Sequence, residues 1–147
     1  THLMLSEMLT MDFTDKKVLD MGSGTGVLAI LAEKKGASSL DAIDIDEWAF
    51  ENCNENALRN NCSKIQSIQG GAEKINQRYD IILANINRNI LTRDGSIYWE
   101  HLVAGGHLLL SGFYEQDVPI LMNAFPSGKP IQQTVKEGWC MLHLTKS

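Results

Sequence analysis

The chain has 147 residues, enough for about one domain, and its hydrophobic fraction of 44% is ordinary for a globular chain with a core. A net charge of -5 disfavours a broad nucleic-acid-binding surface but tolerates a basic protein partner. Three cysteines without Cys-x-x-Cys spacing fit the reducing cytosol, and no apolar run approaches the ~18 residues of a membrane span. We therefore expect a cytoplasmic protein that binds neither membranes nor nucleic acid directly.

Apolar periodicity and turn residues predict alternating helices and strands along the chain. In chain order, the expected elements are a short helix over Thr1–Leu9, a strand over Lys17–Met21, a helix over Gly24–Lys35, a strand over Leu40–Asp44, a helix over Glu47–Asn60, strands over Ile65–Gln69 and Tyr79–Ala84, a helix over Arg88–Leu102, a strand over His107–Ser111, a helix over Glu115–Ala124, and strands over Ile131–Glu137 and Trp139–Thr145. Asp94-Gly95 is expected to interrupt the fourth helix, Ala104-Gly105-Gly106 to form a turn, and Gly138 to join the last two strands. This pattern predicts an α/β fold with a mostly parallel seven-stranded sheet and a C-terminal antiparallel hairpin.

The first expected strand runs into a glycine-rich turn, Asp20-Met21-Gly22-Ser23-Gly24-Thr25-Gly26. Glycines at such a bend bring the backbone close to a ligand. A dinucleotide fingerprint would need glycine where Val27 stands, and the Asp20 carboxylate would repel a pyrophosphate. A carboxylate suits an ammonium group or hydroxyls, so we expect Asp20, Gly22 and Gly24 to contact such a ligand. The pattern acid-x-Gly-x-Gly-x-Gly resembles that of S-adenosylmethionine-dependent methyltransferases.

Two other strand ends place polar side chains at the same expected sheet edge. Asp44 ends the second strand about 20 residues past Gly22, the distance at which an acid commonly holds the ribose hydroxyls of an adenosine. Asn85 directly follows the apolar fourth strand, where it is a ligand-contact candidate or a turn former. Methyltransferases that act on nitrogens often carry Asn or Asp here, followed by Pro-Pro, and hold the substrate nitrogen with its lone pair toward the methyl group. The absence of the prolines argues against the usual adenine and glutamine modifiers.

The remaining polar candidates have structural interpretations. Asp46 is expected to cap the following helix, Asp41 to be a solvated edge residue, and Glu73 to be a surface charge. The four histidines show no metal-ligand spacing, so no metal site is expected.

Several motifs spread over the chain are shared with one family. They are Thr1-x-Leu3-x-Leu5, Val18-Leu19-Asp20-x-Gly22-x-Gly24-x-Gly26, Asp44-Ile45-Asp46, Ala84-Asn85-Ile86, Gly105-Gly106-x-Leu108, Ser111-Gly112 and Trp139-Cys140. Together they resemble the catalytic domain of the ribosomal protein L-eleven (L11) methyltransferases, and the resemblance covers essentially the whole chain. It implies a Rossmann-like class I methyltransferase fold with S-adenosylmethionine as cofactor. It also implies cofactor contacts by Thr1, Gly22, Asp44 and Asn85.

The resemblance further implies methyl transfer to lysine and N-terminal amines of ribosomal protein L-eleven, with Asn85 as the catalytic residue. Members of this family also carry an N-terminal substrate-recognition domain, which is not among residues 1–147. Three alternatives stay open: a methyltransferase for a small molecule or RNA, a nicotinamide-dependent oxidoreductase, and a cofactor-binding domain without activity of its own. Val27 and Asp20 argue against the oxidoreductase.

Overall fold

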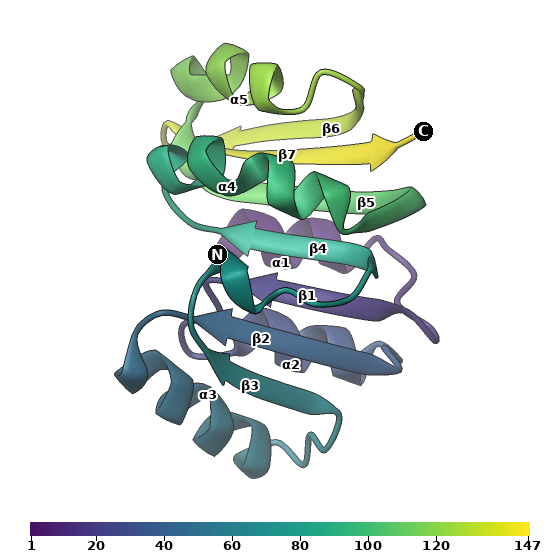
Figure 1. Cartoon of the computed structure of the whole chain (residues 1–147), viewed down its shortest axis with the longest axis vertical. Helices are drawn as coiled ribbons and strands as arrows, with labels where there is room; N and C mark the ends of the chain where they lie inside the picture. Colours follow the sequence, from purple (N-terminus) through teal and green to yellow (C-terminus); the bar gives the residue numbers. More distant parts are fainter.

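A single seven-stranded sheet in the order β3-β2-β1-β4-β5-β7-β6 organises the computed structural model, which describes all residues from 1 to 147 (Figure 1). The strands are β1 (Lys17–Met21), β2 (Ser39–Asp44), β3 (Ile65–Gln69), β4 (Tyr79–Asn85), β5 (Leu102–Tyr114), β6 (Gly128–Lys136) and β7 (Trp139–Lys146). β7 alone runs opposite to the other six strands, and it pairs antiparallel with β5 and β6. The predicted mostly parallel sheet with a C-terminal antiparallel hairpin is confirmed.

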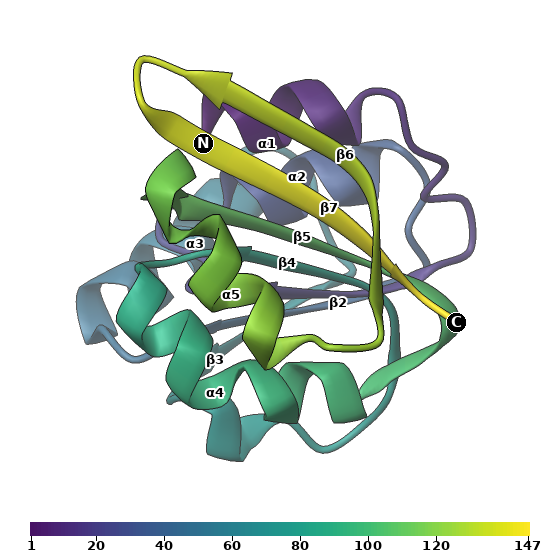
Figure 2. The ribbon, with the colours of Figure 1, turned by 90° about the horizontal axis from the view of Figure 1, so that it is seen from above.

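Helices cover both faces of this sheet. They are α1 (His2–Met8), α2 (Val27–Lys34), α3 (Glu47–Arg59), α4 (Arg88–Glu100) and α5 (Val118–Ala124), with 3-10 turns at Ala72–Lys74 and Glu115–Asp117. Figures 1 and 2 show α1 and α2 on one face and α4 and α5 on the other. Each face has its own hydrophobic core, and Cys53 of α3 belongs to the core beneath α1 and α2. None of the helices is long and apolar enough to cross a membrane.

Two predicted interruptions of secondary structure, at Asp94-Gly95 and at Ala104-Gly105-Gly106, were wrong. α4 runs through Asp94-Gly95 without interruption. A side chain at Gly95 would come within 2.9 Å of the Phe125 ring, so this glycine allows α5 to pack closely rather than ending a helix. Ala104-Gly105-Gly106 lies inside β5, where the register against β4 shifts, and is not a turn between elements.

Asp41 also differs from expectation, because it is only 7% exposed. β2 lies between β1 and β3, so Asp41 is on an interior strand and not at the sheet edge. Its Oδ2 accepts hydrogen bonds from the Tyr79 hydroxyl (2.6 Å) and the Gln77 amide (2.7 Å). The buried carboxyl group therefore ties β2 to the start of β4. The predicted cap of α3 is confirmed, since Asp46 accepts from the Trp48 N–H at 2.9 Å.

Tyr79→Phe should lower the free energy of unfolding by about 1–3 kcal/mol, because the change removes a buried donor to Asp41. Tyr98→Phe is the matched control: the Tyr98 hydroxyl is equally buried but has no hydrogen-bond partner, so its removal should be neutral or stabilising. Urea unfolding of both variants checks this. Equal destabilisation by the two changes would contradict the role given to the Tyr79–Asp41 bond.

Candidate functional site

The carboxyl ends of β1, β2, β4 and β5 lie along one edge of the sheet because these strands are parallel. Strand order reverses between β1 and β4, and ligands of open α/β sheets bind beyond the carboxyl ends at such a reversal. The glycine turn follows β1, Asp44 ends β2, and Asn85 ends β4 next to Ser111 of β5. The fold thus gathers candidates that are distant in sequence.

The glycine turn uses left-handed backbone at Gly22, Gly24 and Gly26, with φ of 76°, 54° and 85°. A Cβ on Gly22 would collide with the Ile86 side chain, and one on Gly26 would come within 2.7 Å of Cys53 Sγ. A Cβ on Gly24 would meet no atom within 4 Å. Two of these glycines therefore serve packing, whereas Gly24 presents its backbone to open space.

Asp44 fixes the exposed part of this turn. Its Oδ2 accepts from the Gly24 N–H at 2.9 Å, and its Oδ1 accepts from the Asp46 N–H at 3.0 Å. Each carboxylate oxygen keeps lone-pair capacity for a further donor. Ile45, directly after it, is 79% exposed and offers an apolar surface beside the carboxylate.

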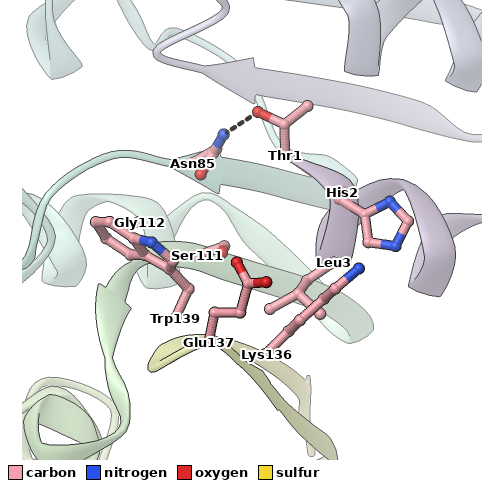
Figure 3. Close-up of a pocket in the computed structure, with 9 residues that line it drawn as sticks. All are labelled: Thr1, His2, Leu3, Asn85, Ser111, Gly112, Lys136, Glu137 and Trp139. Atoms are coloured by element: carbon pink, nitrogen blue, oxygen red, sulfur yellow. Dashed lines mark hydrogen bonds between the residues drawn. The ribbon is translucent and has the colours of Figure 1, made fainter.

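Asn85 and Thr1 face each other across a second part of the site, a pocket of about 410 Å³ (Figure 3). The Asn85 amide Nδ2 donates to Thr1 Oγ1 at 3.0 Å, which leaves the Asn85 Oδ1 free to accept from a ligand. The pocket is lined by Thr1, His2, Leu3, Asn85, Ser111, Gly112, Lys136, Glu137 and Trp139. Sequence reasoning did not identify Lys136 and Glu137 as site residues, because the hairpin that carries them reaches this pocket only through the pairing of β7 with β5.

Asp20, the acid that precedes the glycine turn, has different surroundings from Asp44. Its side chain is fully buried beneath the glycine turn, and neither carboxyl oxygen has a hydrogen-bond partner. The Asp20 carboxyl group is therefore shielded from solvent, although Asp20 precedes Gly22 by only two residues. Burial raises the pKa of Asp20 to about 7; the nearby Ala29 backbone acts in the opposite direction, and the charge of Asp44 adds to the rise.

Two histidines that are far apart in sequence lie together elsewhere in the fold. His107 Nδ1 and His143 Nε2 are 2.8 Å apart, and His143 Nδ1 lies 2.6 Å from Glu7 Oε2 of α1. No group of three or more His, Cys, Asp or Glu side chains is arranged to hold a metal ion. Pairing of β5 with β7 creates this contact, so spacing along the chain carried no signal for it.

Asp20→Asn should gain stability relative to the parent protein as pH rises from 5 to 8. The folded protein holds the Asp20 proton up to about pH 7, whereas the unfolded chain releases it near the ordinary aspartate pKa of 3.8. Stability from this group therefore falls as pH rises from 5 to about 7, by about 3 kcal/mol, and asparagine abolishes the fall. Urea unfolding across pH checks this, with exposed Asp15→Asn as control. A pH-independent difference between Asp20→Asn and the parent would contradict the burial argument.

Comparisons with known proteins agree with this geometry. The family model described as "Ribosomal protein L11 methyltransferase (PrmA)" matches residues 1–147. A ribosomal protein L11 methyltransferase from Porphyromonas gingivalis is 48% identical over 149 residues, covering 99% of this chain and 51% of that protein. The chain spans about half the length of the curated relatives it matches.

Solved structures show the same architecture. The ribosomal protein L11 methylase of Lactobacillus delbrueckii subsp. bulgaricus superposes with a TM-score of 0.91 at 27% identity, covering 99% of this chain and 77% of that one. An RNA methyltransferase from Salinibacter ruber, solved with S-adenosyl-L-homocysteine, superposes with a TM-score of 0.80, covering 100% of this chain and 92% of that one; at 15% identity it shows a shared fold alone. Because the family model matches all of residues 1–147, the chain belongs to the ribosomal protein L11 methyltransferase family.

Proposed function

We propose that this chain is the cofactor-binding catalytic domain of a cytoplasmic enzyme that transfers methyl groups from S-adenosylmethionine to lysine and N-terminal amino groups of ribosomal protein L11. Membership of the family supports the substrate. The observation that carries the chemistry is the open backbone at Gly24, held by Asp44, at the same sheet edge as Asn85 and its pocket.

The residues present fit S-adenosylmethionine. The open side of Gly24 admits a ligand against the backbone, and the free lone pairs of Asp44 suit ribose hydroxyls. Exposed Ile45 offers an apolar contact for the flat face of the adenine ring beside that ribose. Thr1 and Asn85 would then lie toward the methionine end, in the pocket of Figure 3. When bound, S-adenosylmethionine supplies a sulfonium methyl group that a nucleophile can attack.

Asn85 orients the incoming amine in this proposal. Its Nδ2 is engaged by Thr1, so its Oδ1 is the atom that accepts a substrate N–H and turns the nitrogen lone pair toward the methyl group. A lysine with a pKa near 10.4 costs about 4.6 kcal/mol to deprotonate at pH 7, and desolvation in a pocket lowers this cost. A neutral amide cannot take the proton, so the amine loses it to solvent before attack.

The proposal is tested by methyl transfer from radiolabelled S-adenosylmethionine to purified ribosomal protein L11, with the full-length Porphyromonas gingivalis relative as reference. We expect label on L11, calorimetric binding of S-adenosylmethionine and S-adenosylhomocysteine, and no binding of NAD. Transfer by residues 1–147 should be slower than by the reference, because remote binding energy positions a protein substrate. Label on RNA instead of L11 would overturn the proposed substrate, and equal rates would contradict a separate recognition domain.

Asp44→Ala should weaken S-adenosylmethionine affinity about 10- to 150-fold, the effect of losing charge-assisted hydrogen bonds worth roughly 1.5–3 kcal/mol. Calorimetry measures this change. Asp46→Ala is the neighbouring control: it removes the cap of α3, at about 1 kcal/mol of stability, and should leave affinity unchanged. Parent-like affinity in Asp44→Ala would remove this residue from the ribose site.

Asn85→Ala should lower the single-turnover rate about 100-fold at saturating cofactor while changing cofactor affinity less than about tenfold, because it misplaces the amine. Asn87→Ala is the control. The Asn87 side chain accepts from the Ile90 N–H and caps α4, so its loss should cost about 1 kcal/mol of stability with an unchanged rate. A parent-like rate in Asn85→Ala would end the orienting role.

A further inference from the structure

The turn between β6 and β7 carries a residue that its backbone disfavours. Glu137 and Gly138 are the two central residues, with φ of 53° and 85°, as in a type I′ turn. Such turns prefer Asn, Asp or Gly at both positions, and glutamate is rare in left-handed backbone. A disfavoured residue held in this conformation points to a function for its side chain.

The Glu137 side chain lies in the pocket that holds Asn85. Figure 3 shows its carboxylate directed into the pocket, on the side of Asn85 and Ser111, while Lys136 extends toward His2 and Leu3. Glu137 is exposed and forms no ion pair within the chain. The pocket therefore contains one unpaired acidic side chain, with Lys136 and His2 as its other titratable side chains.

The Trp139 indole lines the same pocket as this carboxylate. Trp139, two residues after Glu137, stacks on Tyr114 with ring centroids 4.4 Å apart, and both residues are 46% exposed. The pairing of Tyr114 with Trp139 in the β5–β7 register fixes the two rings. An apolar surface and a carboxylate in one pocket match the chemistry of a lysine side chain, which has a hydrocarbon stem and a cationic end.

We infer that Glu137 is a specificity-determining residue that receives the protonated amino group of the substrate at the entrance of the pocket. This inference rests on the proposed function, because it assigns the substrate amine to the same pocket. A carboxylate stabilises the charged amine and so favours capture, but it opposes the deprotonation that attack requires. The amine therefore occupies two positions in succession. Exposed Glu137 captures it first, and the less exposed Asn85 then orients it.

The test follows the indole N–H resonance of Trp139 by NMR, with S-adenosylhomocysteine bound and the resonance assigned by Trp139→Phe. The probes are Nα-acetyl-lysine methylamide and its norleucine counterpart, which lacks the amine. The parent protein should bind the lysine probe more tightly than the norleucine probe. Glu137→Gln should weaken the lysine probe about fivefold, the size of one exposed ion pair, and leave the norleucine probe unchanged.

Two further variants separate charge from turn geometry. Glu137→Asn removes the charge with a residue that favours this backbone, so it should melt at the same or a higher temperature and lose the same preference for lysine. Glu51→Gln, which neutralises an exposed acid on α3 outside the pocket, should bind both probes like the parent. With L11 as substrate, Glu137→Gln should raise KM about fivefold while kcat stays within about twofold.

The inference is overturned if the parent binds both probes equally, or if both Glu137 variants bind the lysine probe like the parent. It is separable from the proposed substrate. Discrimination of lysine from norleucine, together with methyl label on RNA instead of L11, would support the amine site and reject L11 as its substrate.

Discussion

Close packing of Ile86 between two glycines is the constraint on which the site depends. The Ile86 side chain fills the space that a Cβ on Gly22 would need, and its carbonyl oxygen would lie 2.6 Å from a Cβ on Gly112. Its N–H also donates to the Ser111 carbonyl at 3.1 Å. The turn after β1, the end of β4 and the end of β5 can therefore meet only because both glycines lack side chains. This contact brings Asn85 to the same edge as the open backbone of Gly24.

The two acids near the glycine turn act differently because their surroundings differ. Asp44 is partly exposed and accepts two backbone N–H groups, so it shapes the turn and still faces the site. Asp20 has no partner and no exposure, and its raised pKa makes a neutral carboxyl group accessible near pH 7. The acid of the glycine motif is thus buried without a hydrogen-bond partner, while the acid that holds the turn comes from β2.

α1 is held at both ends. The Thr1 hydroxyl accepts from the Asn85 amide at the carboxyl edge of the parallel strands, and Glu7 contacts buried His143 in the middle of β7. His143 in turn lies against His107, whose pKa is lowered by burial and by that neighbouring ring. These contacts set the position of α1 over the sheet, and with it the position of the Thr1 hydroxyl that orients the amide of Asn85.

The sequence by itself determined the alternation of strands and helices, the glycine turn, and the placement of Asp44 and Asn85 at strand ends, because local periodicity and turn chemistry encode these features. Tertiary structure alone decided the rest. Asp20 and Asp41 are buried because of which strands and helices surround them, and Gly95 continues a helix because α5 packs against it. Glu137 lies in the pocket because β7 pairs with β5, and these two strands are not consecutive in the chain. Such features depend on contacts between distant residues, which no local pattern in a single sequence records.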